Sequence, residues 1–324
     1  MKNIILKSIS FKKFLLCLIT LSSFSLNAQY FDWERTNKRY KNEIVLGFGT
    51  SNFLGDLGGR DQTGSNFIYD LEHTHFNFAM NLGYRRNLSK YFAVKANFNF
   101  SQVSGDDALT QEPFRNNRNL NFYSDIFELS IHAEWYLYRA KPSHIHRLKG
   151  PKGKHGRNHE LYLFAGIGGF HFNPKADYNG KTYKLKEHRT EGQGLPGAPK
   201  EYSNFSLSIP MGVGFSYRLN RLFKVALEMS YHKTFTDYID DASGVYYDND
   251  IIRAEFGDEA AFLADPSKGE FPGQTAAGQV RGDSSDMDAY LNAFFSIQYR
   301  IYDRNGGGRG RSHKFKRRRQ RAQF

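Results

Sequence analysis

The stretch DIFELSIHAEWYLY, residues 125–138, alternates apolar and polar side chains over its whole length. Its odd-numbered positions from Phe127 to Leu137 are apolar. Its even-numbered positions carry polar groups: Glu128, Ser130, His132 and Glu134. A period of two predicts a β-strand with one apolar face, because successive side chains of a strand point to opposite sides.

The same alternation recurs along the chain and predicts seven further strands. The predicted strands are 43–50, 75–86, 91–102, 125–138, 160–172, 204–218, 222–233 and 288–302. Most reach the roughly 9–11 residues that let a tilted strand cross a bilayer. Eight antiparallel strands can close without an edge, so the sequence predicts an all-β, eight-stranded transmembrane barrel over 43–302. A soluble β-sandwich or a lipocalin-like barrel shows similar alternation and is the rival interpretation.

The N-terminus predicts export. Lysines precede a short apolar run, and the pattern ends in Ala28, as in a secretory signal peptide of residues 1–28. Residues 29–42 would be a periplasmic lead-in. The single cysteine, Cys17, lies in the signal peptide, so the mature chain would have no disulfide and no thiol ligand. Without the four lysines of that segment, the net charge falls from +12 to +8.

The connections between the predicted strands alternate in length. The turns at 86–90 and 219–221 are short and 139–159 is of intermediate length, whereas 51–74, 103–121, 173–204 and 236–287 are long. Outer-membrane barrels have short periplasmic turns and long external loops. This parity places both chain ends, including a disordered tail at 303–324, in the periplasm.

Charge differs between the two predicted sides. Residues 139–157 contain seven Lys or Arg and no acidic residue, and the tail is also basic. The external loop 236–287 has twelve Asp or Glu and three basic residues. The candidate partner-binding residues on the basic side are Lys149, Lys152, Lys154, Arg157, Lys316, Arg317, Arg318, Arg319 and Arg321. They suit an acidic periplasmic protein or, alternatively, anionic lipid head groups; export argues against nucleic acid.

Polar residues on the inner face would meet inside the barrel. They are Lys95, Glu128, His132, Glu134, Lys224, Glu228, His232 and Arg300. Eight strands leave room for little more than side chains, which favours a packed network of ion pairs and hydrogen bonds. Two alternatives are a lipid hydrolase using Ser130 with His132 or Ser230 with His232, and an open pore.

The other polar clusters are interpreted as structural or solvated groups rather than as binding sites. Asp237, Asp240, Asp241, Asp248 and Asp250 could gather calcium, but their spacing favours a role in ordering the loop. The tripeptide Arg281-Gly282-Asp283 is interpreted as a chance occurrence of an adhesion motif. His144, His146, His155 and His159 are interpreted as solvated side chains, so no metal or cofactor is expected.

Two patches support a family resemblance. FGTSNFLGDLGG (48–59) and FTDYIDDASGVYYD (235–248), followed by a predicted short helix within 251–267, resemble the DUF6089 family of Bacteroidota outer-membrane barrels, which includes PorG-like components of the type IX secretion system. The motif residues are Gly55, Asp56, Leu57, Asp237, Tyr238, Asp240 and Asp241. The basic tail has no counterpart in this resemblance.

The resemblance implies a structural function. The barrel would anchor periplasmic ring proteins, PorK and PorN, to the outer membrane. It would need no catalytic residue and no small-molecule substrate, and outer-membrane lipid would surround it. The alternatives are an adhesion or binding barrel that acts through loop 236–287 and, less favoured, a lipid-modifying enzyme.

Overall fold

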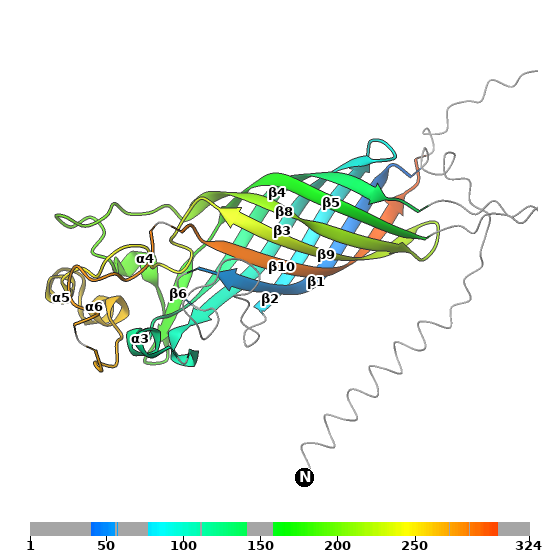
Figure 1. The fold of residues 1–324 in the computed structure, drawn as a ribbon. Helices are drawn as coiled ribbons and strands as arrows, with labels where there is room; N and C mark the ends of the chain where they lie inside the picture. The colour runs from blue at the N-terminus through cyan, green and yellow to red at the C-terminus, as the bar shows by residue number, and fades with distance from the viewer. Residues whose placement is uncertain are drawn as a thin grey trace, which may run out of the picture.

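The computed structural model describes residues 40–55, 57, 77–110, 112–140, 158–271, 273–284 and 286–303. Eight strands form a closed antiparallel barrel (Figure 1). They are β1 (Asn42–Leu54), β2 (Asn77–Asn87), β3 (Phe92–Asp106), β4 (Asn121–Tyr138), β5 (His159–His171), β8 (Phe205–Arg218), β9 (Phe223–Thr234) and β10 (Ala289–Ile301). Each pairs with its neighbour in chain order, and β1 pairs with β10 to close the cylinder. The predicted fold class and all eight predicted strands are confirmed.

The alternation of the sequence becomes the two faces of the barrel wall. Along β4 every second residue from Phe122 to Tyr136 is buried, and Leu129 and Ile131 between them are exposed. Because Pro210 lacks an amide hydrogen, the sequence predicts a bulge or an irregular point in β8. The structure shows an irregular point rather than a bulge. The β5–β8 ladder has a two-residue gap beside Pro210, and the register is unchanged on both sides of it.

Secondary structure outside the barrel gathers at one end, here called the loop end (Figure 1). It comprises the hairpin β6 (Pro174–Tyr178) and β7 (Lys181–Lys184), the 3-10 helix η2 (Asp107–Leu109), and the helices α3 (Pro113–Arg118), α4 (Leu185–His188), α5 (Asn249–Phe256) and α6 (Asp258–Ala264). The sequence predicts one short helix within 251–267, whereas the structure has two, separated by Gly257 at a φ of 97°. None of the described helices is both long and apolar enough to cross a membrane.

The loop-end segments form a folded cap over the barrel mouth. A buried apolar cluster joins strand ends to loop residues, including Phe53, Leu57, Val103, Phe122, Phe170, Phe172, Leu185, Ile239, Leu263 and Tyr290. Burial of this size favours the compact arrangement by the hydrophobic effect. The described parts of the long connections are therefore packed structure rather than extended loops, which their polar composition did not predict.

The opposite end, here called the turn end, has two short described connections, β2–β3 and β8–β9, and the connection from β4 to β5, of which only the ends are described. In the β2–β3 turn, Leu88 and Ser89 donate their backbone N–H groups to the carbonyl of Phe92, and Leu219 and Asn220 do the same to Phe223 in the β8–β9 turn. Asn42 pairs with Ile301, so the first strand starts and the last strand finishes at this end (Figure 1).

Candidate functional site in the barrel interior and the loop cap

Charged side chains fill the barrel interior in equal numbers of each sign. On the described strands, five acidic and five basic residues are buried on inward-facing positions: Glu43, Glu128, Glu134, Glu160 and Glu228, with Arg85, Lys95, Arg218, Lys224 and Arg300. All eight residues predicted for the interior polar network lie inside the barrel: Lys95, Glu128, His132, Glu134, Lys224, Glu228, His232 and Arg300. Equal numbers of both signs let every buried charge pair with an opposite charge. A buried charge without such a partner would cost a large desolvation free energy.

Arg85 is the centre of this network. Its guanidinium lies 2.7 Å from a Glu134 oxygen, 3.0 Å from Glu228 and 3.4 Å from Glu43. It also donates a hydrogen bond of 2.8 Å to the side-chain oxygen of Gln298. One cation therefore ties together strands β1, β2, β4, β9 and β10.

Two lysines extend the network through carboxylates that Arg85 also contacts. The Lys224 ammonium lies 2.8 Å from Glu43 and 2.9 Å from Glu160, and Lys95 lies 2.9 Å from Glu228. The Lys95–Glu228 contact joins strands on opposite sides of the barrel, and each Lys224 contact spans one intervening strand. The arrangement is a packed, ion-paired core in this part of the lumen.

A Ser–His–Glu chain lies nearer the loop end. Ser230 Oγ is 2.9 Å from His232 Nε2, and His232 Nδ1 is 2.8 Å from Glu128 Oε2. Nucleophile, base and orienting carboxylate have this order in hydrolases. Here the same Glu128 oxygen also accepts hydrogen bonds from Ser208 and Tyr290, and His232 is fully buried beneath the cap.

The second Ser–His pair is enclosed in the same way. Ser130 Oγ lies 3.0 Å from His132 Nε2, and both residues are buried. In this conformation both pairs are part of the interior packing and meet no open surface.

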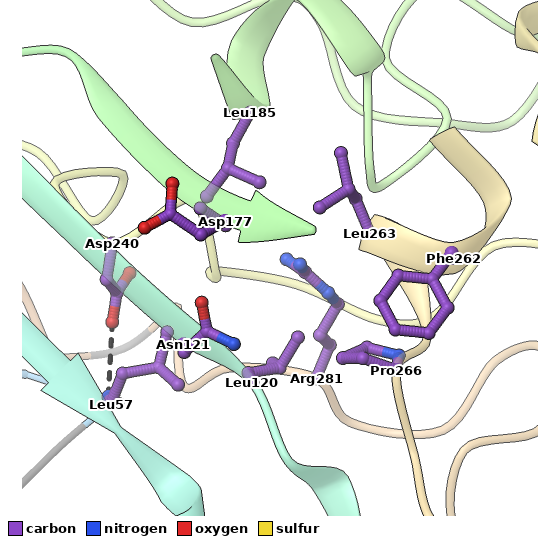
Figure 2. Close-up of a pocket in the computed structure, with 11 residues that line it drawn as sticks. Leu57, Leu120, Asn121, Asp177, Leu185, Asp240, Phe262, Leu263, Pro266 and Arg281 are labelled. Carbon is purple, nitrogen blue, oxygen red and sulfur yellow. Dashed lines mark hydrogen bonds between the residues drawn. The ribbon is translucent and has the colours of Figure 1, made fainter. Parts of the chain in front are cut away.

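The two patches that carry the family resemblance meet in the cap. Leu57 donates its backbone N–H to Asp240 Oδ2 at 3.1 Å, as the dashed line in Figure 2 shows. Both residues line a cavity of about 20 Å³ together with Leu120, Leu185, Leu263 and Arg281 (Figure 2). A cavity of this size holds about one water molecule. Asp240 therefore joins two segments that lie far apart in the sequence.

The other motif residues also help to close the cap. Tyr238 stacks on Tyr202 with ring centroids 4.5 Å apart, and Asp237 is buried. Gly55 lies against Asp288, and a Cβ atom at Gly55 would come within 2.3 Å of Asp288 Oδ1. A larger residue there would have to displace the side chains of Asp288 and Phe53. Asp56 lies outside the described residues.

Asp241 belongs to a second buried ionic cluster. Arg281 lies 3.2 Å from Glu191 and 3.9 Å from Asp241, and Asp241 accepts hydrogen bonds from Tyr202 and Thr190. Burial raises the pKa of Asp241 to about 6, because it outweighs the lowering by Arg281. Burial likewise raises the pKa of Tyr238 to about 12. Two acids share one cation here, in contrast to the balanced lumen.

The acidic residues considered for calcium separate into different contacts. Asp240 and Asp241 make the bonds given above, Asp248 caps α5, and Asp250 pairs with Arg253 at 3.0 Å. Within the described ranges, no group of three His, Cys, Asp or Glu residues is placed to hold a metal ion. Arg281 of the Arg-Gly-Asp tripeptide is buried in its ionic cluster and does not present an adhesion motif.

Several predictions from the sequence concern residues that the structure does not describe. They are the signal peptide 1–28, His144, His146 and His155, and all the candidate basic residues: Lys149, Lys152, Lys154, Arg157, Lys316, Arg317, Arg318, Arg319 and Arg321. His159, which is described, stacks on Tyr138 with ring centroids 5.0 Å apart.

Sequence reasoning left some interior and cap residues off the candidate list. The parity of the predicted strands places Arg85 and Glu43 on the polar face, so the signal is present in the sequence. Glu160 belongs to a strand that is apolar on both faces, which hid its direction. Glu191 and Arg281 are brought together only by loop folding, and no local pattern predicts their pairing.

Comparison with protein families identifies the chain. The model of a family described as Domain of unknown function (DUF6089) matches residues 30–260. The chain belongs to this family. A comparison with curated proteins finds no match.

Solved structures with a similar arrangement of strands are outer-membrane proteins. The Yersinia pestis attachment invasion locus protein Ail is 10% identical, with a TM-score of 0.35 over 81% of this chain and 99% of that chain. A major outer membrane protein from Thermus thermophilus is 11% identical, with a TM-score of 0.35 over 80% and 99%. The E. coli Outer Membrane Protein W is 14% identical, with a TM-score of 0.31 over 81% and 99%. What those proteins bind carries no implication for this chain.

Proposed function

We propose that this DUF6089 protein is an outer-membrane barrel that anchors a periplasmic protein-secretion assembly, as PorG-like components of the type IX system do. The observation that supports it most is the barrel wall. Its outside is an apolar belt, and its inside is an ion-paired core. Such a wall suits an anchor better than a channel or a soluble carrier.

The belt has the composition that a bilayer requires. Most outward-facing positions on the described strands carry exposed Leu, Ile, Val, Met or Phe. Leu129 and Ile167 are 66% and 73% exposed, which water would disfavour and hydrocarbon would not. On β9 the only charged residue that faces outward is Lys233, at the loop-end edge of the belt. Its long aliphatic chain lets the ammonium group reach the lipid head groups. The closed ladder leaves no free strand edge, as lipid demands.

Aromatic residues mark the two edges of the belt and differ between them. The turn-end edge carries Tyr84, Phe92, Trp135, Tyr217, Phe223 and Tyr299, whereas the loop-end edge carries Phe78, Phe127, Phe205 and Phe235. Aromatic girdles of this kind lie at the interfaces of membrane barrels. Tyr and Trp add polar groups that suit the head-group layer.

The turn end is the proposed docking face, with the short turns in the periplasm. Arginines hold these turns in place: Arg139 donates to the carbonyl of Ser89 at 2.6 Å, and Arg300 donates to the carbonyl of Arg221 at 3.2 Å. Rigid turns lower the entropic cost of binding. The basic segments 139–157 and 303–324 leave the barrel on this side, so the partner we propose is an acidic surface of PorK- or PorN-like ring proteins.

Co-purification from detergent-solubilised outer membranes tests the proposal. The full chain is compared with two variants, one lacking 304–324 and one with the Lys and Arg of 141–157 replaced by Gln. The proposal predicts that periplasmic partners are lost when both changes are combined, while the barrel still sediments with the membrane.

Loop-end charge provides the control for this experiment. Asp250 and Asp258 are replaced by Asn, which should leave recovery of the partners unchanged. Full recovery by the combined variant contradicts docking, whereas a barrel that purifies without detergent contradicts membrane insertion.

A second candidate is binding at the loop end, favoured by the folded cap. Deletion of 236–287 is a poor test of it, because Ile239, Ala242 and Leu263 belong to the buried cluster of the cap. Point variants on the cap surface are required instead.

A further inference from the structure

A cavity of about 290 Å³ opens in the cap surface, away from the lumen. Its walls are formed by Phe114, Arg115, Arg118, Tyr246, Gln274, Thr275, Gln279 and Val280. None of these residues lines the smaller cavity beside Asp240. Its size is close to the lower limit of about 300 Å³ for small-molecule sites.

One wall of the cavity is a fixed helix. Glu112 caps α3 by accepting the N–H of Arg115 at 2.7 Å, and the backbone N–H groups of Glu270 and Phe271 donate to the side-chain oxygen of Asn117. Asn119 donates from its side chain to the carbonyl of Pro266 at 3.1 Å. The helix is therefore fastened to the segment 266–271, and the wall is formed before any ligand arrives.

The facing wall is a short antiparallel pairing. Tyr246 donates its N–H to the carbonyl of Gln279 and accepts the N–H of Gly278, both at 2.8 Å, and Val245 bridges Val280. The Tyr246 ring lines the cavity, yet its buried hydroxyl has no hydrogen-bond partner among the described residues. A buried hydroxyl without a partner costs about 1–3 kcal/mol. Because the hydroxyl has almost no exposed surface in this conformation, a ligand oxygen could satisfy it only after a small movement of the side chains that cover it.

The lining has a particular chemistry. It contains two guanidinium groups, two amides and two hydroxyls, and it contains no acidic side chain. Asp107, which lies outside the lining, holds Arg118 by contacts of 2.6 and 3.1 Å and lies 3.5 Å from Arg115. The exposed Phe114 adds an aromatic face to the wall, and its ring centroid lies 5.4 Å from that of Phe271.

We propose that this cavity binds an acidic monosaccharide unit, a ring that carries hydroxyl groups and one carboxylate. The carboxylate faces Arg115, since guanidinium and carboxylate form charge-assisted hydrogen bonds. Ring hydroxyls meet the amides of Gln274 and Gln279 and the Tyr246 hydroxyl. The apolar face of the ring lies against Phe114. This proposal does not depend on docking at the turn end.

Ligand-observed NMR titration of the full protein in detergent micelles provides the test, with sodium glucuronate as the probe. Tyr246→Phe removes only the hydroxyl without a partner, so the thermal stability should stay equal or rise, whereas glucuronate binding should weaken about fivefold. Arg115→Gln should weaken it at least about tenfold. The matched control is Tyr247→Phe, the adjacent tyrosine, whose hydroxyl donates to the carbonyl of Pro196; glucuronate binding should not change.

Three further probes define the ligand class. Glucose should bind at least about tenfold more weakly than glucuronate, because it lacks the charge that Arg115 recognises. A uronate trisaccharide that binds more tightly than the monosaccharide indicates a polysaccharide source, whereas equal affinity indicates a free sugar. Equal binding of glucose, equal binding of inorganic phosphate, or unchanged binding to both Tyr246→Phe and Arg115→Gln overturns the proposal.

Discussion

Arg85 in the lumen and Arg281 in the cap are both fully buried arginines among carboxylates, yet their surroundings differ in kind. Arg85 is held by side chains from strands whose register is fixed by backbone ladders, and the lumen charges balance. Arg281 is held by loop residues, and two acids share it. We therefore expect the lumen to be the permanent structural core, and the cap to open locally and to respond to pH.

The largest expected effect comes from breaking the lumen network. Arg85→Met leaves Glu43, Glu134 and Glu228 buried without their shared cation, so the barrel should lose about 3–5 kcal/mol of unfolding free energy. Urea-induced unfolding of the membrane-inserted protein measures this loss. The control is the neighbour Arg86→Met, which lies on the other face of β2 and should change the free energy by less than about 0.5 kcal/mol. Similar losses in the two variants would mean that the interior network does not contribute specifically to the free energy of unfolding.

Removal of the cap arginine should have a smaller global effect. Arg281→Met leaves Glu191 and Asp241 buried together, but the cap can relieve this by opening while the strands stay paired. We expect faster hydrogen exchange in 236–247 and 185–204, with barrel strands unchanged and global unfolding altered by less than about 1 kcal/mol. Exchange measured by mass spectrometry separates the two regions. If barrel strands exchange faster as well, the cap and the lumen form one cooperative unit.

The stability of the cap should depend on pH more strongly than that of the lumen. Burial raises the pKa of Asp241 from 3.8 to about 6, so this group stabilises the closed cap most at low pH. That contribution is lost as the pH rises from about 4 through about 6, and a shift of this size corresponds to about 2 kcal/mol between pH 4 and pH 7. Limited proteolysis at 236–247 should therefore become faster over this range. A protease active at both pH values, standardised on an unfolded substrate, provides the measurement.

Asp241→Asn tests the cause of that dependence. The variant has no charge to bury, so its cap should be more resistant than wild type at pH 7 and equally resistant at pH 4. An unchanged pH dependence in the variant would assign the effect to another group. Glu191, which shares Arg281, is the next residue to replace.

The sequence predicted the barrel because its signal is local. Alternation along 125–138 determines which side chains point inward, and antiparallel closure then brings the predicted polar residues into one interior. It could not predict which inward groups pair with one another, such as Lys224 with both Glu43 and Glu160, because these pairings depend on the register and shear of the closed sheet.

The cap was beyond local reasoning for a different reason. The sequence predicts only a long loop at 173–204, yet this segment contains β6, β7 and α4 and supplies Thr190, Glu191 and Tyr202 to the cluster around Asp241. Its order comes from contacts with 236–247, which are distant in sequence. The family resemblance identified the patches of Asp240 and Leu57, but only the fold shows that they touch.

The smallest expected change in the stability of the cap itself concerns that contact. Asp240 accepts the N–H of Leu57 at 3.1 Å with one oxygen and the N–H of Ala242 at 3.0 Å with the other. In Asp240→Asn an amide nitrogen replaces one acceptor, so a buried N–H loses its partner at a cost of about 1–2 kcal/mol. We expect faster exchange at Leu57 or Ala242, with no change at the lumen strands, because the loss is confined to the cap.

Asp250→Asn, at a highly exposed pair with Arg253, serves as the control for Asp240→Asn and should cost less than about 0.5 kcal/mol. Both replacements remove one negative charge from the same long connection, so they differ mainly in burial and in the backbone groups that the carboxylate holds. Equal effects of the two would mean that Asp240 does not hold the two patches together. The stability of the cap would then not depend on the contact between these two patches.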